Sequence, residues 1–315
     1  MELAMKDLLR ISYLRIRVDI QFLNNCELPV SKTSAIRGGI GDAMLRIKCT
    51  NEGNCEGCDL NNSCDVRNFM YSQIENAPPD MKTNPSLGYV IECEDYSESF
   101  EKDDQMKFYV ILFGENISRI SLLRDAIIDF GKTGLGVHRS KFEMIGFTDD
   151  DTGQSFLEQD LSDESMIKGK KVIDYVEKRI KRLEKSETYL INFKTAVTIK
   201  ENGTILKDLT ASGLCNSLLR RIYMLNMYEH ITDKPPDFGQ DHPVIVRQNM
   251  RPIAMPRFSG AKNQKMYLNG IKGSVVLSNV SDEWLALLLA GELLHVGKNT
   301  SFGFGRYTVK ELHMG

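Results

Sequence analysis

Hydrophobic and polar residues alternate in several short stretches of this chain, and between them apolar residues recur at helical spacing. The alternation over residues 11–22 (ISYLRIRVDIQF) is typical of a half-buried strand, whereas residues 31–47 (SKTSAIRGGIGDAMLRI) begin with Ser and Thr and have helical spacing. Residues 1–148 are therefore predicted to follow the order β-α-β-β-α-β of a ferredoxin-like unit. The predicted strands are 11–22, 87–93, 106–113 and 141–147, and the predicted helices are 31–47 and 118–130.

The same order returns in the second part of the chain. The predicted strands there are 188–199, 247–258, 265–277 and 305–312, and the predicted helices are 209–228 and 282–294. We therefore expect an α+β protein with two tandem ferredoxin-like (RRM-like) domains, residues 1–148 and 187–315. An acidic loop and a charged helical linker, residues 149–186, are expected to join them.

A glycine-rich turn follows the second helix of each predicted domain. The turns are Gly131–Gly136 (GKTGLG) and Gly297–Gly305 (GKNTSFGFG), and each leads to a basic residue and an aromatic one. Equivalent turns in two similar units support a tandem duplication. The three glycines inside helix 31–47 each cost helix stability, roughly 1 kcal/mol, which indicates close approach of a partner segment.

Composition is that of a soluble globular protein. The chain has 315 residues, which suits two domains, and 42% are hydrophobic and 26% charged. No stretch approaches the ~20 apolar residues of a membrane span, and charges interrupt the first residues too often for a signal peptide. We expect a cytoplasmic protein without a membrane partner.

The net charge of −3 conceals an asymmetry. Residues 1–164 hold 17 Lys and Arg against 29 Asp and Glu, whereas residues 165–315 hold 23 against 14. This distribution favours polyanion binding mainly on the C-terminal half. Two solvated surfaces of opposite sign explain it equally well.

Four of the seven cysteines form a cluster, C-x5-C-x2-C-x5-C, made by Cys49, Cys55, Cys58 and Cys64. The central pair lies on one tight turn, and the outer two can complete a tetrahedral shell of four thiolates around zinc. An iron–sulfur cluster is the alternative. Four protein ligands leave no open position for chemistry, so we expect a structural metal and no catalytic one.

The turn Gly297–Gly305 offers backbone N–H groups, a lysine and hydroxyls that suit a phosphate. A nucleotide P-loop is excluded at both turns because Ala126 stands where its first glycine belongs and Asn299 where Ser or Thr belongs, so no nucleotide cofactor is expected. We predict RNA phosphate binding instead. The expected RNA-binding residues are Lys132, Arg139, Arg257, Lys298, Thr300, Ser301 and Arg306.

The run from Gly291 to Tyr307 (GELLHVGKNTSFGFGRY) resembles the terminal glycine-rich signature of the CRISPR repeat-RNA processing endoribonucleases, the Cas six family of the RAMP superfamily. The likeness extends to residues 37–41 (RGGIG), the four-cysteine segment, residues 134–139 (GLGVHR) and residues 258–270 (FSGAKNQKMYLNG). It covers nearly the whole chain in order.

This resemblance implies two ferredoxin-like domains and metal-independent cleavage of CRISPR precursor RNA within its repeat, by attack of a 2′-OH on the adjacent phosphate. Many family members have a catalytic histidine in or near the first helix, but this chain has no histidine before His138. The candidate catalytic residues are therefore His295 and His138, which flank the glycine turns, with Arg37 and Lys32.

A non-catalytic RNA-binding subunit of a CRISPR effector complex is the alternative, since related RAMP proteins hold guide RNA and fold does not fix function. In either case repeat RNA is the expected partner, with CRISPR effector subunits as further possible partners. A nucleotide-binding enzyme is disfavoured by the failed P-loop pattern.

Overall fold

The computed structural model describes residues 2–55, 57–60, 63–72, 74, 86–161, 167–236, 242–259 and 264–312. The chain divides into two compact units. The first, here the N-terminal unit, comprises residues 13–169 and 257–266. The second, here the C-terminal unit, comprises residues 1–12, 170–256 and 267–315.

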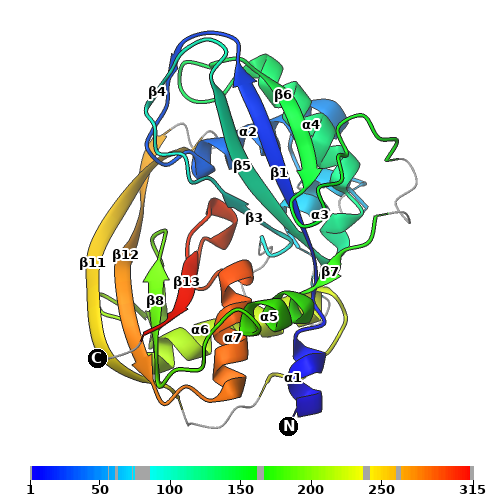
Figure 1. Cartoon of the computed structure of the whole chain (residues 1–315). Helices are drawn as coiled ribbons and strands as arrows, with labels where there is room; N and C mark the ends of the chain where they lie inside the picture. Colours follow the sequence, from blue (N-terminus) through cyan, green and yellow to red (C-terminus); the bar gives the residue numbers. More distant parts are fainter. Residues whose placement is uncertain are drawn as a thin grey trace. The chain divides into compact units, whose positions relative to one another are not determined.

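The N-terminal unit contains an antiparallel sheet in the order β3-β5-β1-β6 (Figure 1). Counted along the chain, these four strands stand in the order 2-3-1-4, as the predicted β-α-β-β-α-β unit requires. The elements are β1 (Ser12–Phe22), α2 (Thr33–Lys48), β3 (Tyr89–Glu92), β5 (Gln105–Phe113), α4 (Ile120–Thr133) and β6 (Phe142–Asp149).

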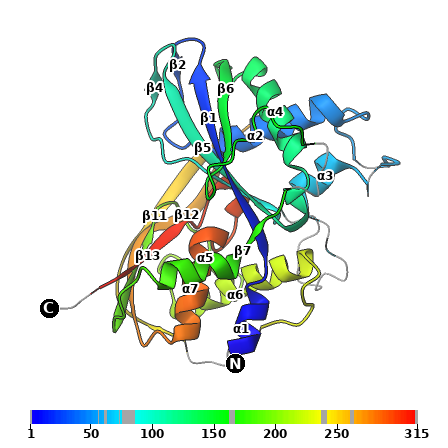
Figure 2. The same cartoon turned by 45° about the vertical axis from the view of Figure 1, so that its right-hand side comes forward.

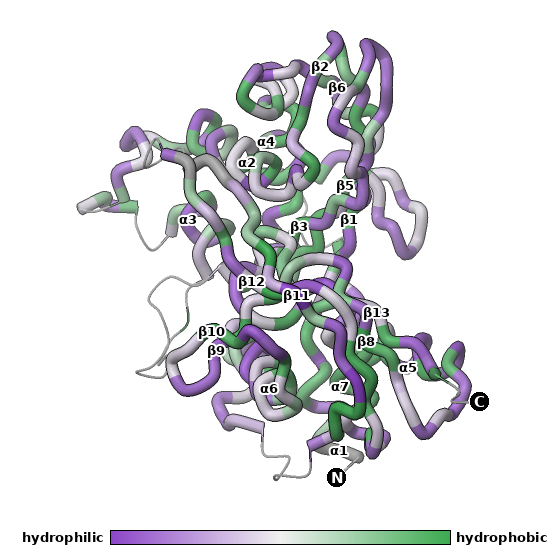
Figure 3. Tube along the Cα trace, turned by 90° about the vertical axis from the view of Figure 1, so that its left-hand side faces the viewer, coloured by the Kyte–Doolittle hydropathy of each residue, from purple (hydrophilic) through white to green (hydrophobic). Residues whose placement is uncertain are grey.

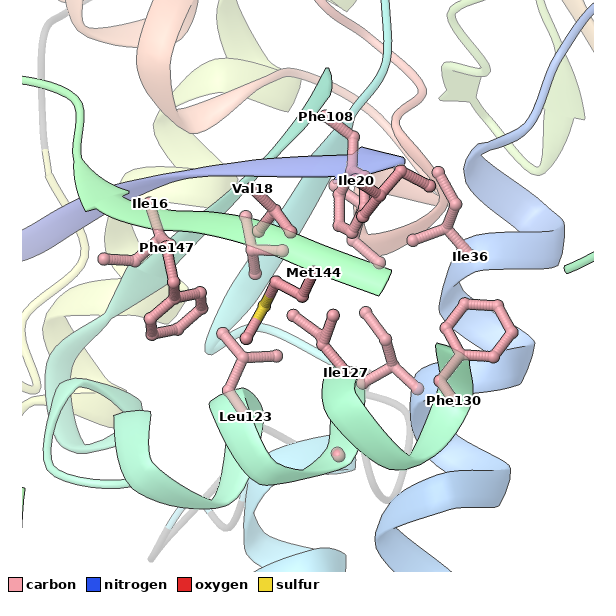
Figure 4. Packing of buried hydrophobic residues seen from close by; sticks show 14 of the residues in the cluster. Ile16, Val18, Ile20, Ile36, Phe108, Leu123, Ile127, Phe130, Met144 and Phe147 are labelled. Atoms are coloured by element: carbon pink, nitrogen blue, oxygen red, sulfur yellow. The ribbon is translucent and has the colours of Figure 1, made fainter. Parts of the chain in front are cut away.

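Helices α2 and α4 cover one face of this sheet, and the core lies between (Figure 4). The even-numbered residues of β1, Ile16, Val18 and Ile20, are fully buried because alternate side chains of a strand share a face. Opposite them lie Ile127 and Phe130 of α4. A Cβ on Gly39 of α2 would stand 2.0 Å from the Phe130 ring, so this glycine permits the two helices to pack closely.

The C-terminal unit has a second sheet with the same topology, β11-β12-β8-β13 (Figure 2). Helix α7 packs on β13, where the Tyr307 hydroxyl donates to the Leu288 carbonyl at 2.7 Å. Thr210 and Ser281 cap α6 and α7 by accepting backbone hydrogen bonds through their side chains. The elements are β8 (Thr188–Phe193), α6 (Ala211–Tyr228), β11 (Val244–Ser259), β12 (Gln264–Ser278), α7 (Asp282–Leu294) and β13 (Tyr307–Glu311). The α+β class with two ferredoxin-like units is confirmed.

The two units differ in their bounds from the predicted domains, because residues 1–12 and 170–186 belong to the C-terminal unit and residues 257–266 belong to the N-terminal unit. The charged helix expected in the linker is α5 (Val172–Ile180), which belongs to the C-terminal unit and packs against α7. Arg179 of α5 binds both carboxylate oxygens of the buried Glu292, at 2.7 and 3.0 Å. The N-terminal helix α1 (Glu2–Leu8) also belongs to this unit, although the sequence placed residues 1–148 in one domain.

Several short elements have no periodic signal in the sequence. They are β2 (Cys26–Glu27), α3 (Asp65–Met70), β4 (Ser99–Phe100), the 3-10 turn η1 (Gly114–Ile117), β7 (Lys170–Lys171), β9 (Lys200–Glu201), β10 (Thr204–Ile205) and the 3-10 turn η3 (Thr300–Phe302). No helix within the described ranges is long and apolar enough to span a bilayer.

Candidate nucleic-acid interface

The glycine-rich loop of the C-terminal unit has a backbone that only glycine tolerates at two positions. Gly297 has φ +87°, and a Cβ there would stand 2.6 Å from the Thr198 carbonyl. Gly305 has φ +74°, and a Cβ would stand 1.8 Å from the Val296 carbonyl. Both are left-handed conformations that L side chains rarely adopt, so the glycines fix the path of the loop.

Backbone hydrogen bonds attach this loop to the segment that follows β8. The Lys298 N–H donates to the Thr198 carbonyl at 2.8 Å, and the Gly305 N–H donates to the Ala196 carbonyl at 2.7 Å. The N–H groups of Phe302, Gly303 and Phe304 also donate to carbonyls within the loop. These backbone N–H groups thus hold the loop together. They are therefore not available to bind a phosphate in the way that the sequence suggested.

The side chains of the loop divide into buried and exposed ones. Thr300 and Ser301, predicted to bind RNA, have only 6% and 4% of their surface exposed, which argues against direct phosphate contact. Lys298 is exposed and Arg306 is half-buried. A cationic contact to a phosphate therefore falls to Lys298 and Arg306.

His295, a predicted catalytic residue, lies inside the C-terminal unit. Its exposed fraction is 0%, and its Nδ1 stands 2.9 Å from the Phe304 carbonyl of the loop. It follows the last residue of α7 with φ +59°, and beside it the buried Arg221 donates through Nε to the Leu294 carbonyl at 3.1 Å. This placement gives His295 a structural role, joining the end of α7 to the loop.

The corresponding turn of the N-terminal unit is shorter and exposed. Gly134 has φ +90° and ends α4, and Leu135 and Ser140 exchange two backbone hydrogen bonds of 2.9 Å. Residues 137–139 form the tip, where His138 and Arg139 are exposed and Val137 is 82% exposed. Lys132, on the last turn of α4, is exposed as well.

His138 lines an open pocket of about 730 Å³ beside the paired strands β2 and β4. Three carboxylates, Glu27, Glu101 and Asp104, line the same pocket, and they repel a phosphate group. Sequence reasoning misses this pocket, because β2 and β4 have two residues each and their pairing is set by the tertiary fold.

The two candidates at the start of α2, Lys32 and Arg37, lie in different surroundings. Lys32 has 1% of its surface exposed, and its Nζ donates to the Asp95 and Ser97 carbonyls at 2.9 and 2.7 Å. Burial lowers the pKa of Lys32. Lys32 therefore anchors the start of α2, and its ammonium is not available to RNA. Arg37 is half-buried, with its guanidinium 5.9 Å from the centre of the Tyr89 ring and 3.3 Å from the Ser86 Oγ.

Further basic residues lie on β11, a strand at the edge of the C-terminal sheet. Arg247 and Arg251 are exposed there, and Figure 3 shows hydrophilic stretches along this strand. The side chain of Arg257 lies outside the described residues. The cysteine cluster lies between α2 and α3, with Cys55 exposed and Cys49, Cys58 and Cys64 partly exposed, whereas Cys26, Cys93 and Cys215 are buried.

Two family models match the chain. Residues 191–307 match the model of the CRISPR-associated endoribonuclease Cas6. Residues 9–171, more than half of the chain, match a model named AF_1859_N and described as an N-terminal domain. Comparison with curated proteins finds no match.

The fold is also similar to solved structures of low sequence identity. A Cas6 product complex matches with TM-score 0.53 and 11% identity over 94% of this chain and 99% of that one. Cas6 of Thermus thermophilus matches with TM-score 0.50 and 10% identity, over 95% and 98%.

A partial Cas6-RT-Cas1–Cas2 complex matches with TM-score 0.57 and 14% identity, over 97% of this chain but 48% of that one. This chain thus spans about half the length of that longer protein. Residues 191–307, which include the glycine-rich loop, thus match the model of the Cas6 endoribonuclease, and the two ferredoxin-like units have the fold of the solved Cas6 structure.

Proposed function

We propose that this chain cleaves CRISPR precursor RNA within its repeat and that the cleavage uses no catalytic metal. The observation that carries the proposal is the Cas6 endoribonuclease model, whose match over residues 191–307 includes the glycine-rich loop and the exposed Lys298. The match of residues 191–307 to this model supports a role in CRISPR RNA processing or binding.

The proposed step is a transesterification within the RNA. The 2′-oxygen loses its proton and forms a bond to the adjacent phosphorus, while the bond from phosphorus to the 5′-oxygen breaks. The 5′-oxygen takes up a proton, which leaves a 2′,3′-cyclic phosphate and a 5′-hydroxyl. Because the nucleophile is tethered beside its target, the protein has to orient the phosphate, transfer protons and stabilise charge.

The exposure of each candidate residue decides which of these tasks it can perform. The cations Lys298, Arg306 and Arg37 suit phosphate binding and charge stabilisation. His138 is the exposed histidine next to a glycine turn and is the candidate for proton transfer, although three carboxylates share its pocket. His295 and Lys32 are buried among protein contacts and support the fold.

A non-catalytic RNA-binding subunit is the second candidate function. The observation that favours it is the burial of His295 and Lys32, which leaves His138, in an acidic pocket, as the one histidine of the catalytic set at the surface. A protein that only holds RNA needs exposed cations and no proton transfer group.

The deciding experiment incubates the purified chain with its repeat RNA in excess EDTA, beside a copy that is 2′-deoxy at the scissile nucleotide. We expect one cut in the first RNA and none in the second. Tight binding without a cut in either RNA would reject the enzyme and favour the RNA-binding subunit. A cut only when a divalent metal is restored would reject the metal-independent mechanism.

Partners are proposed on the same basis. Repeat RNA is the proposed main partner, and the similarity to a Cas6-RT-Cas1–Cas2 complex adds Cas1–Cas2 proteins to the CRISPR effector subunits as candidate protein partners. Copurification of the chain with each protein, with and without repeat RNA, tests these pairs one by one.

A further inference from the structure

The segment between α2 and α3 contains four cysteines whose surroundings differ from those of the other three. Cys26, Cys93 and Cys215 are buried, and burial raises the pKa of the Cys215 thiol to about 12, which makes it inert. Cys55 is exposed, and Cys49, Cys58 and Cys64 are partly exposed. Free cysteine is among the most buried residue types, so four accessible thiols within 16 residues need an explanation other than packing.

The backbone of this segment folds around the thiols in tight turns. Gly53 has φ +80° and Gly57 has φ +74°, so the chain reverses once after Cys49 and once between Cys55 and Cys58. The Gly53 N–H donates to the Cys49 Sγ at 3.2 Å, and the Cys55 thiol lies 3.8 Å from the Gly53 carbonyl. Two thiols from opposite sides of a turn thus contact the same glycine.

The remaining two cysteines continue this arrangement. The Cys58 N–H donates to the Cys55 carbonyl at 3.4 Å, which closes the C-x2-C turn. Cys64 is the residue directly before α3 and packs partly against the hydrophobic core, as Cys49 stands directly after α2. The ligand set is therefore anchored at both ends by helices.

We propose that Cys49, Cys55, Cys58 and Cys64 bind one zinc ion as thiolates and that the ion fixes the segment between α2 and α3. Four thiolates in tetrahedral geometry are a preferred structural zinc site, and the N–H donated to a Cys49 sulfur stabilises negative charge there. Zinc binding releases the thiol protons.

Zinc binding would order the backbone of this segment. Among the described residues no three His, Cys, Asp or Glu side chains stand together in metal-binding positions, and none of the described residues between α2 and α3 forms a helix or strand. Closing the tetrahedron thus requires the turns to move together, which is the usual coupling of zinc binding to local folding. The four-ligand shell leaves no open position, so this zinc takes no part in RNA cleavage.

Metal analysis of the full chain, purified without a histidine tag, tests this proposal independently of any RNA activity. We expect about one zinc per chain, released by a thiol-modifying reagent. Cys55→Ser and Cys58→Ser should each lower the zinc content at least about tenfold, whereas the control Cys215→Ala should retain it.

A second measurement covers the case in which the serine variants misfold. Hydrogen exchange of residues 49–64 is compared between zinc-loaded and chelator-treated wild-type chain, and zinc should slow exchange in this segment while the sheet of β3, β5, β1 and β6 stays protected. Absence of zinc together with no uptake of added zinc would overturn the proposal. Iron in the purified chain, with the absorption spectrum of an iron–sulfur cluster, would reject zinc in favour of that cluster. A disulfide among the four cysteines in the freshly purified chain would also reject the zinc proposal.

Discussion

The backbone N–H of Ser12 lies 2.8 and 2.9 Å from the two carboxylate oxygens of Glu229, although 217 residues separate them. Lys171 donates through Nζ to the Ser12 Oγ at 2.8 Å, so Ser12 connects the start of β1 both to β7 and to the end of α6. Burial raises the pKa of Glu229 to about 7, against the opposing effects of the Ser12 hydrogen bonds and the Lys171 charge.

This pKa predicts a pH-dependent stability. Between its ordinary value of 4.5 and about 7, Glu229 holds its proton in the folded chain and not in the unfolded one. The free energy of unfolding should therefore fall as pH rises through this window, by up to about 3 kcal/mol, and level off above pH 7. Urea denaturation at several pH values measures it. Glu229→Gln should flatten the dependence, and Glu187→Gln, at an exposed glutamate, should keep it. Equal pH profiles for wild type and Glu229→Gln would contradict the prediction.

Two adjacent glycines of α2 should respond in opposite directions to alanine. A Cβ on Gly39 would collide with the Phe130 ring, so Gly39→Ala should destabilise the chain by about 1–3 kcal/mol. A Cβ on Gly38 would meet nothing within 4 Å, so Gly38→Ala should stabilise the helix by about 0.5–1 kcal/mol. Denaturation curves of the two variants serve as controls for each other. The packing of α2 on α4 would be contradicted if both substitutions had the same sign.

Alanine substitution of the two histidines next to the glycine turns should have different effects. One substitution should lower stability, and the other should slow catalysis. His295→Ala removes a fully buried ring bound to the Phe304 carbonyl and should cost about 2–4 kcal/mol. His138→Ala, at an exposed tip, should change stability by less than about 0.5 kcal/mol but slow single-turnover cleavage of repeat RNA. Unaltered cleavage rates in both variants would remove both histidines from the acid–base chemistry.

Binding of RNA should depend on salt through the exposed cations. For single-stranded RNA, the slope of log K against log salt concentration is about −0.7 for each phosphate contact. Lys298→Ala should make the slope less steep by about 0.7, whereas Lys185→Ala, at an exposed lysine between α5 and β8, should leave it unchanged. Filter binding at several salt concentrations gives both slopes. An unchanged slope for Lys298→Ala would remove this lysine from the RNA-binding surface.

Periodic elements could be predicted from the sequence, and isolated contacts could not. The strands and long helices of both units are predicted within about three residues, except that the strand predicted over 188–199 ends at Phe193, because alternation and helical spacing report which side faces a core. The division of the C-terminal unit into separate chain segments could not be predicted. Helices α1 and α5 show ordinary amphipathic or charged patterns, and the residues that they contact lie far along the chain, as Glu292 does for Arg179.

The candidate site was predicted unevenly for a similar reason. Residue type and spacing found the glycine-rich loop and its exposed Lys298, but side-chain burial is a tertiary property. Lys32 and His295 carry the right chemical groups for catalysis, and the fold uses them to bind the Asp95, Ser97 and Phe304 carbonyls instead.

The split of the C-terminal unit has a consequence for biosynthesis. Residues 1–12 belong to this unit, yet their partners in α5 and α6 follow residue 169 in the chain. A ribosome therefore completes residues 13–169, which are all of the N-terminal unit except residues 257–266, before it makes the partners of α1. These residues thus have the first opportunity to fold. In topological terms residues 13–169 are an insertion, and its two ends are adjacent, because the Val172 N–H donates to the Ile11 carbonyl at 2.9 Å. A chain in which Ser12 is joined to Lys170 would test whether the C-terminal unit folds without the inserted residues 13–169.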